Sequence, residues 1–255
     1  MTKPLILVTN DDGVASPGIR ALVEVAEKLG EVVVVAPDQA RSGMGHAITL
    51  ENTLRRTAIN YFEGIEAYSC SGTPVDCVKL AINVFLDRKP DLIISGINHG
   101  SNASVNVIYS GTMSAAVEGA MEKIPSIGFS LLDHSIDANF ETAKKYADKI
   151  IKETLKQGIP EGICLNVNFP KLSETEIAGI KICRQCNGNW TEEFDARTDP
   201  AGKEYYWLTG VFINYEPDAT DTDIWALDNH YISIVPVHCD MTAYKAIDKL
   251  NTWNL

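Results

Sequence analysis

The chain has 255 residues, 45% of them hydrophobic, enough to bury a large core in one domain or in one domain with an elaboration. Its formal net charge of −12 argues against binding to long nucleic acid, which needs clustered Lys and Arg side chains. No stretch approaches the roughly 20 apolar residues needed to cross a bilayer, and no secretion signal opens the chain, so we expect a soluble cytoplasmic protein that does not bind membranes.

The first half of the chain alternates between strand and helix patterns. Short, continuous apolar runs at residues 5–9, 31–36, 91–95 and 126–131 are typical of strands buried on both faces of a parallel sheet. Helices are expected from Pro17 to Gly30, from Pro74, from about Thr112, and from about residue 137 to 155. Ser16 and Thr73 stand at N-cap positions. This alternation predicts an α/β fold with a doubly wound, mainly parallel sheet between two helical layers.

The pattern changes after about residue 160, where strand-like segments follow one another with few helices between them. Residues 184–230 are rich in Asn, Asp, Thr, Gly and aromatic residues, and we interpret them as a β-hairpin arm suited to packing against another subunit. We therefore divide the chain into a core, residues 1–183, and an extension, residues 184–255. The extension holds the arm, a strand returning to the core and a C-terminal helix.

The six cysteines are scattered, as expected of reduced thiols in a chain too large to depend on disulfides. Cys183 and Cys186 alone have metal-like spacing. A zinc site would need two further ligands at similar spacing, and neither a second CxxC nor an HxxxH is present. We expect a structural role for this pair or none.

Candidate functional residues follow the predicted strands. Asp11 and Asp12 end the first strand, Ser42 and Gly43 follow the second, and Asn98 and His99 follow the strand at 91–95. Ligands of doubly wound sheets collect at the carboxyl ends of the strands, so these loops should converge. Two adjacent carboxylates repel each other unless they take up a proton or share a cation. An oxygen-only set of Asp, Ser and Asn donors suits Mg²⁺ or Mn²⁺.

The helix beginning near Thr112 presents a positive dipole end and backbone amides, which suit a phosphate group. A metal beside a phosphate indicates phosphoryl chemistry. His46 and His99 lie in the same loops and could protonate a leaving group or have only a structural role. Two alternatives stay open: a receiver-type signalling domain that binds Mg²⁺, and a phosphatase with an aspartyl-phosphate intermediate. The first lacks its phosphate-accepting Asp, and the second typically has DxD spacing.

Six motifs, in order, resemble the SurE family of survival-protein nucleotidases: ILVTNDDG, APDQARSG, SGTPVDCV, SGINHGSN, YSGTMSAA and LNVNFP. The resemblance extends from residue 5 to about 170, weakens across 184–230 and returns at YISIVPV. It implies a Rossmann-like fold and a divalent-metal-dependent phosphomonoesterase acting on nucleoside 5′- and 3′-monophosphates, with short polyphosphate as a further possible substrate.

The resemblance also implies site residues and partners. One Mg²⁺ or Mn²⁺ ion per subunit would be held by Asp11, Asp12, Ser42 and Asn98, the first two being catalytic. The family's phosphate-side residues map onto Asn10, Gly43, Ser110, Gly111 and Thr112. Family members form dimers or tetramers through exchanged C-terminal segments, so we expect a homodimer or homotetramer.

Overall fold

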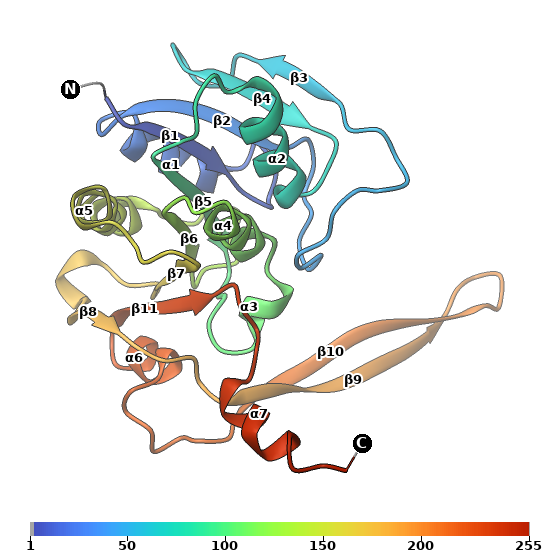
Figure 1. Cartoon of the computed structure of the whole chain (residues 1–255). Helices are drawn as coiled ribbons and strands as arrows, with labels where there is room; N and C mark the ends of the chain where they lie inside the picture. The colour runs from blue at the N-terminus through green and yellow to red at the C-terminus, as the bar shows by residue number, and fades with distance from the viewer. Residues whose placement is uncertain (1–2, 255) are drawn as a thin grey trace.

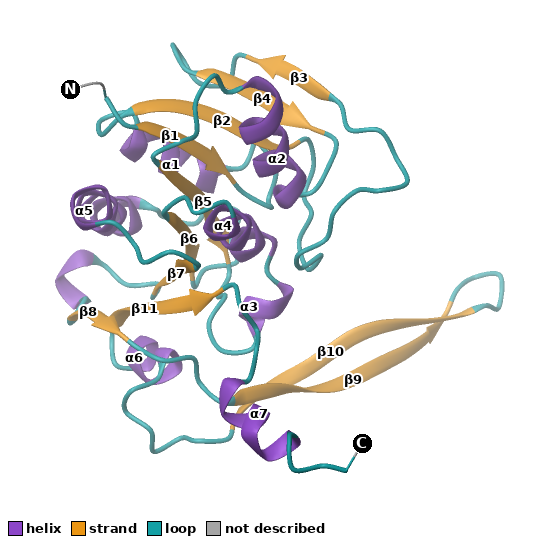
Figure 2. Cartoon of the chain, in the orientation of Figure 1, coloured by secondary structure: helices purple, strands orange, loops and turns teal. Residues whose placement is uncertain are grey.

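Figure 1 shows the computed structural model of the chain, which describes residues 3–254. A nine-stranded sheet forms the centre of the molecule, and a separate two-stranded hairpin projects from it (Figure 2). The strands are β1 (Leu5–Thr9), β2 (Glu31–Pro37), β3 (Arg56–Ile59), β4 (Glu66–Cys70), β5 (Leu92–His99), β6 (Ser126–Leu131), β7 (Ile163–Phe169), β8 (Gly179–Ile182), β9 (Gly188–Thr198), β10 (Glu204–Asn214) and β11 (Tyr231–His238). The helices are α1 (Pro17–Ala26), α2 (Pro74–Leu80), α3 (Asn106–Tyr109), α4 (Gly111–Met121), α5 (Glu141–Gln157), α6 (Asp223–Asp228) and α7 (Tyr244–Leu250).

The large sheet has the strand order β3-β4-β2-β1-β5-β6-β7-β11-β8. The six strands from β4 to β7 run parallel to one another. At one edge β3 is antiparallel to β4, and near the other edge β11 is antiparallel to β7 and parallel to β8. The predicted α/β fold with a mainly parallel sheet is confirmed.

Two apolar cores lie on opposite faces of this sheet, because neighbouring residues of a strand point to opposite faces. On one face, Ile6 and Val8 of β1 belong to a core shared with α1 and α5. On the other, Leu5 and Leu7 pack in a second core with residues of α2 and α4. The result is the expected three-layer arrangement, visible in Figure 1 with α1 and α5 on one side of the strands and α2 and α4 on the other.

Local signals set where the helices begin. In α2, Thr73 Oγ1 accepts a hydrogen bond from the Asp76 amide (3.1 Å), and the Asp76 carboxylate accepts one from the Thr73 amide (2.9 Å). The expected start of α5 at about residue 137 is wrong by four residues. Asn139 is the reason, because its side chain accepts from the Glu141 amide and keeps the preceding turn out of the helix.

Two features of the sheet were not predicted. The edge strand β3 and its neighbour β4 were not predicted because neither has a continuous apolar run, and β3, Arg-Thr-Ala-Ile, is largely exposed. Strand β5 was expected to end at residue 95 but continues to His99 after an irregularity between Ser95 and Asn98. This extension carries Asn98 and His99 toward the carboxyl end of β1.

The arm, β9 and β10, is the expected hairpin. Its strands pair antiparallel over 11 residues each, from Gly188 opposite Asn214 to Thr198 opposite Glu204, and it extends well beyond the body of the molecule (Figure 2). The chain then returns to the large sheet through α6 and β11 and ends beside the base of the arm with α7 (Figure 1). A membrane-spanning helix would have to be longer and more apolar than any helix among residues 3–254.

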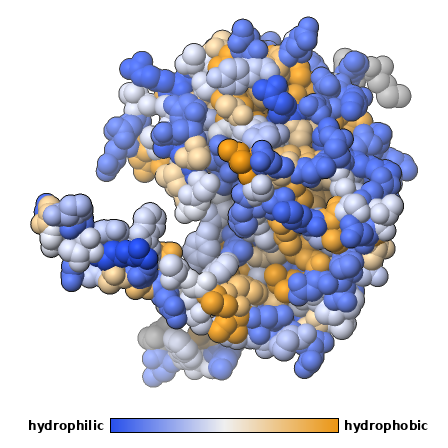
Figure 3. All heavy atoms as spheres, turned by 180° about the vertical axis from the view of Figure 1, so that it is seen from behind, coloured by the Kyte–Doolittle hydropathy of each residue, from blue (hydrophilic) through white to orange (hydrophobic). Residues whose placement is uncertain are grey.

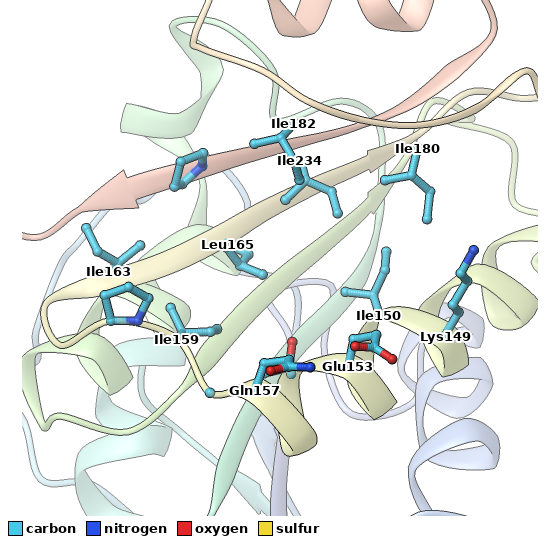
Figure 4. A pocket seen from close by; sticks show the side chains of 14 residues that line it. Lys149, Ile150, Glu153, Gln157, Ile159, Ile163, Leu165, Ile180, Ile182 and Ile234 are labelled. Atoms are coloured by element: carbon cyan, nitrogen blue, oxygen red, sulfur yellow. The ribbon is translucent and has the colours of Figure 1, made fainter.

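An apolar pocket of about 420 Å³ lies between the C-terminal part of α5 and strands β7, β8 and β11 (Figure 4). Isoleucines dominate its lining, and Lys149, Glu153 and Gln157 stand on the helix at its border. The pocket adjoins Ile163, where β7 begins. It is therefore at the amino end of a parallel strand, away from the carboxyl ends that carry the candidate residues.

Candidate functional site

Asp11 is the second residue after β1 and is only 3% exposed. Its Oδ1 accepts a hydrogen bond from the Thr112 hydroxyl in the first turn of α4. Gly111 permits this close approach, because a Cβ there would lie 2.7 Å from Asp11 Cβ and 2.9 Å from Oδ2. Burial raises the pKa of Asp11 from 3.8 to about 6, the Thr112 hydroxyl lowers it, and the charge of Asp12 raises it further.

Asp12 faces a different element, the extended end of β5. Its Oδ2 accepts from the His99 amide (3.2 Å) and lies 3.0 Å from His99 Nδ1. The tautomer with its hydrogen on Nδ1 satisfies this contact. His99 Nε2 is buried without a hydrogen-bond partner among the described residues, and the imidazole packs edge-on against Phe140. His99 therefore holds Asp12 in place, and at 18% side-chain exposure Asp12 is the more accessible of the two carboxylates.

The other two proposed metal ligands lie on segments that contact the pair. The Asn98 side-chain nitrogen donates to the Gly100 carbonyl (2.9 Å), which leaves its Oδ1 as a ligand atom. Ser42 lies on the exposed loop after β2. The neighbouring Arg41 amide donates to the Asp11 carbonyl (2.7 Å), so the loop is attached directly beside the buried carboxylate. The structure thus gathers all four segments at one place.

Asn10 does not offer a hydrogen-bond donor to a phosphate in this structure. Its side-chain nitrogen donates to the Gly13 carbonyl (2.9 Å) and to the Ser16 hydroxyl (2.8 Å). Its Oδ1 is buried without a partner among the described residues. Ser16, expected to cap α1 with its side chain, occupies the N-cap position but bonds Asn10 instead. Asn10 therefore shapes the loop that presents the two carboxylates.

The first turn of α4 provides the remaining polar groups. Ser110 Oγ caps the helix by accepting from the Met113 amide (3.0 Å), and the Ser110 carbonyl accepts from the Ser114 amide (3.0 Å). The Thr112 hydroxyl donates a hydrogen bond to the Asp11 carboxylate, and both this hydroxyl and the Thr112 amide lower the pKa of Asp11. Among the described residues, no hydrogen-bond acceptor is found for the Gly111 amide, so it is available to an anion at the helix start. Gly43 is exposed on the facing loop.

One cluster around a buried carboxylate was not anticipated. Glu118 of α4 is 3% exposed, lies 2.9 Å from His46 Nε2, and accepts a hydrogen bond from Lys79 Nζ (2.8 Å). These partners lower the pKa of Glu118, His46 having the largest effect. His46 therefore ties the Ser42 loop to α4, and Lys79, whose side chain is 47% exposed, joins the same cluster. The sequence signal for this cluster was Glu118 itself, the one acidic residue among the small residues of Ala115–Ala120.

The chemistry of the site depends on oxygen ligands. Within residues 3–254, no group of three or more His, Cys, Asp and Glu side chains is placed to hold a metal ion. A cation at Asp11 and Asp12 therefore needs neutral oxygen donors such as those of Ser42 and Asn98. Cys183 and Cys186 are buried free thiols near the base of the arm.

Comparison with known proteins gives one family. The family model described as survival protein SurE matches residues 6–192. Two relatives are each called 5′-nucleotidase SurE. The protein of Flavobacterium johnsoniae is 62% identical over 254 residues, covering 99% of this chain and 98% of the relative. That of Flavobacterium psychrophilum is 60% identical over 256 residues, covering 100% and 99%.

A solved structure agrees with the family model and with the two relatives. The crystal structure of the SurE protein from Aquifex aeolicus superimposes with a TM-score of 0.84 at 42% identity, covering 97% of this chain and 98% of that one. Fold, family model and full-length similarity lead to the same conclusion: the chain belongs to the SurE family.

Proposed function

We propose that this chain is a 5′-nucleotidase, which hydrolyses nucleoside 5′-monophosphates to nucleosides and phosphate. The observation that carries the proposal is the contact between Asp11 and the first turn of α4, which sets a carboxylate pair against an anion-binding helix start. The names of the full-length relatives support the same reaction.

A divalent cation fits this site. Burial and the charge of Asp12 both raise the pKa of Asp11, so the pair lacks a compensating positive charge. Asp11, Asp12, Ser42 and Asn98 would hold one ion per subunit, and their oxygen atoms favour Mg²⁺ or Mn²⁺. When bound, such an ion neutralises phosphate charge and makes water more acidic.

The protein's own groups take the other roles. Hydrolysis forms a bond from a water oxygen to phosphorus and breaks the bond to the nucleoside oxygen, which gains a proton. Asp12 accepts the proton of the attacking water, because it is the more exposed carboxylate and His99 fixes its orientation. The Gly111 amide and the dipole of α4 bind the phosphate, with Ser110 capping that turn and Thr112 holding Asp11 in position.

Three finer features belong to the same proposal. The enzyme also acts on nucleoside 3′-monophosphates and on short polyphosphate, since the groups assigned above to the substrate all contact its phosphate. It works as a homodimer or homotetramer through exchange of C-terminal segments. The exposed apolar side chains of α7 and the residues after it support this assembly: Tyr244, Ile247, Leu250 and Trp253.

The test is phosphate release from a panel of 5′- and 3′-monophosphates and from tripolyphosphate, each with Mg²⁺, with Mn²⁺ and with a chelator. We expect 5′-monophosphates to be hydrolysed only when a cation is present. Hydrolysis that continues in the chelator would contradict the metal site, and a complete lack of hydrolysis of monophosphates with either cation would contradict the function.

A further inference from the structure

Three buried asparagines form a hydrogen-bonded cluster beneath the connecting segment, residues 100–110, which joins β5 to α4. Asn166 and Asn168 lie on β7, in the motif LNVNFP, and Asn102 lies on the segment itself. Asn168 is 0% exposed and Asn166 is 1% exposed. An amide in a protein core costs free energy unless it is hydrogen-bonded, and an aliphatic side chain of similar size has no such cost. The groups assigned to the metal and the phosphate do not include this motif, so its polar side chains need another explanation.

The two asparagines of β7 hold the backbone of Asn102 from both sides. The Asn102 amide donates to Asn168 Oδ1 (2.8 Å), and the Asn102 carbonyl accepts from Asn166 Nδ2 (2.8 Å). Asn168 Nδ2 donates to Asn166 Oδ1 (2.9 Å), which fixes the two side chains relative to each other. The Asn102 side chain in turn donates to Ser130 Oγ of β6 (2.7 Å). Asn102 is therefore attached by three hydrogen bonds to two neighbouring strands.

The cluster adjoins a proposed metal ligand. Ser130 is the register partner of Asn98 on β5 and of Asn168 on β7, so these polar residues form a row across three strands. The Gly100 amide donates to the Leu131 carbonyl (2.8 Å), and its carbonyl accepts from Asn98 Nδ2 (2.9 Å). The strands that hold Asn98 therefore also hold the first part of the connecting segment.

The other end of the connecting segment reaches the proposed phosphate site. On the way, the Ser104 amide donates to the Asp223 carboxylate (2.8 Å), and the Ser104 hydroxyl donates to the Cys186 carbonyl at the base of the arm (2.8 Å). The outer part of the arm stands off the body, as Figure 3 shows from behind. Helix α3 and then Gly111 follow. The connecting segment is thus fixed between the sheet and the base of the arm.

We propose that Asn166 and Asn168 are positioning residues for the reaction, which set the separation between the bound metal ion and the bound phosphate; this inference rests on the proposed function. They act through Asn102, whose position fixes the course of the segment between Asn98 and Gly111. Neither asparagine of β7 contacts the substrate. Such positioning matters because a displacement of about 1 Å can cost about 100-fold in rate.

The first test measures how strongly the metal and the phosphate affect each other's binding. Inorganic phosphate is titrated into the full chain by calorimetry, with and without saturating Mn²⁺. Mn²⁺ should strengthen phosphate binding to the wild type by roughly five- to 150-fold, a coupling factor that requires the two ligands to be correctly placed. In Asn168→Leu this factor should fall below about threefold, while one Mn²⁺ per subunit still binds. An unchanged coupling factor would overturn the proposal.

Kinetics separate positioning from a general loss of structure. In Asn168→Leu, kcat for AMP should fall about 100-fold at an unchanged Mn²⁺ stoichiometry. Asn168→Asp keeps an acceptor for the Asn102 amide and should therefore recover part of this loss. If kcat and the Mn²⁺ stoichiometry fell in equal proportion, the substitution would only reduce the folded fraction, and the proposal would be overturned.

Two serines of β6 provide a matched pair of variants, which decide the question if Asn168→Leu does not fold. Both are 0% exposed, and each makes one side-chain hydrogen bond: Ser130 with Asn102, and Ser126 with the Ile124 carbonyl (2.8 Å) near the other end of the strand. Ser130→Ala should lower the coupling factor and kcat by about fivefold or more. Ser126→Ala should leave both unchanged, and equal effects of the two substitutions would overturn the proposal.

The binding measurement also keeps this inference separate from the proposed function. If the wild type hydrolyses no nucleoside monophosphate, the proposed function fails, but Mn²⁺ and phosphate binding still test the role of the asparagines. Conversely, a wild type whose phosphate binding does not respond to Mn²⁺ would overturn the inference even if AMP is hydrolysed.

Discussion

Replacing Asp11 with Asn should stabilise the metal-free protein while abolishing its activity. The carboxylate is 3% exposed, and its pKa rises from 3.8 to about 6 on folding. Because the folded-state pKa is raised, the ionised side chain opposes folding. This cost is small below pH 4, grows as the pH rises from 3.8 to 6, and is complete above that range. At about 1.36 kcal/mol for each pKa unit, the cost is ~3 kcal/mol at pH 8.

Urea unfolding in the presence of a chelator measures this cost. The free energy of unfolding of Asp11→Asn should exceed that of the wild type by ~3 kcal/mol at pH 8 and by less than ~1 kcal/mol at pH 4. Asp137→Asn, at an exposed carboxylate, is the control and should change stability by no more than ~0.5 kcal/mol. Saturating Mg²⁺ or Mn²⁺ should stabilise the wild type alone, by ~2.7 kcal/mol at a hundred times the Kd. A variant less stable than the wild type at pH 8 without metal would refute the reasoning.

Other substitutions test the surroundings of the carboxylates. Gly111→Ala should abolish phosphate release from AMP, because the new Cβ would lie 2.7 Å from Asp11 Cβ; a fully active variant would show that this close approach is not required. Glu118→Gln should lower the free energy of unfolding in urea by ~1–3 kcal/mol at pH 7 through weakened bonds to His46 and Lys79. Since the pKa of Glu118 is lowered on folding, the loss relative to wild type should shrink as the pH falls below 4.5, and a loss that is constant with pH would contradict the pairing. Thr73→Ala removes the capping box of α2 and should cost ~1 kcal/mol in thermal unfolding without changing kcat; no change in stability would argue against the cap.

Much of the fold could be predicted because its strands are continuous apolar runs and its helices begin with clear signals such as Thr73 and Pro74. The carboxyl-end rule for parallel sheets also predicts that Asp11, Asp12 and Asn98 lie near one another. The partners of these side chains could not be predicted in the same way. That Thr112 bonds Asp11, or that Asn10 uses both of its N–H groups inside its own loop, depends on packing between segments far apart in the chain.

The arm, too, could be predicted as an element, but its side-chain contacts could not. Its hairpin was expected from a region rich in Asn, Asp, Thr, Gly and aromatic residues, whereas the register, 11 residue pairs from Gly188 opposite Asn214, is known only from the structure. The position of Trp190 depends on the Asn106 side chain, 84 residues away in the chain, and no local pattern encodes that contact. The contact between the arm and α3 is therefore known only from the assembled structure.

The most direct measurement is anomalous diffraction from crystals grown with Mn²⁺. Our account predicts one anomalous peak per subunit, with Asp11, Asp12, Ser42 and Asn98 as its protein ligands and the start of α4 beside it. A manganese peak elsewhere, or no peak at the carboxylate pair in crystals of an enzyme whose activity requires Mn²⁺, would contradict it.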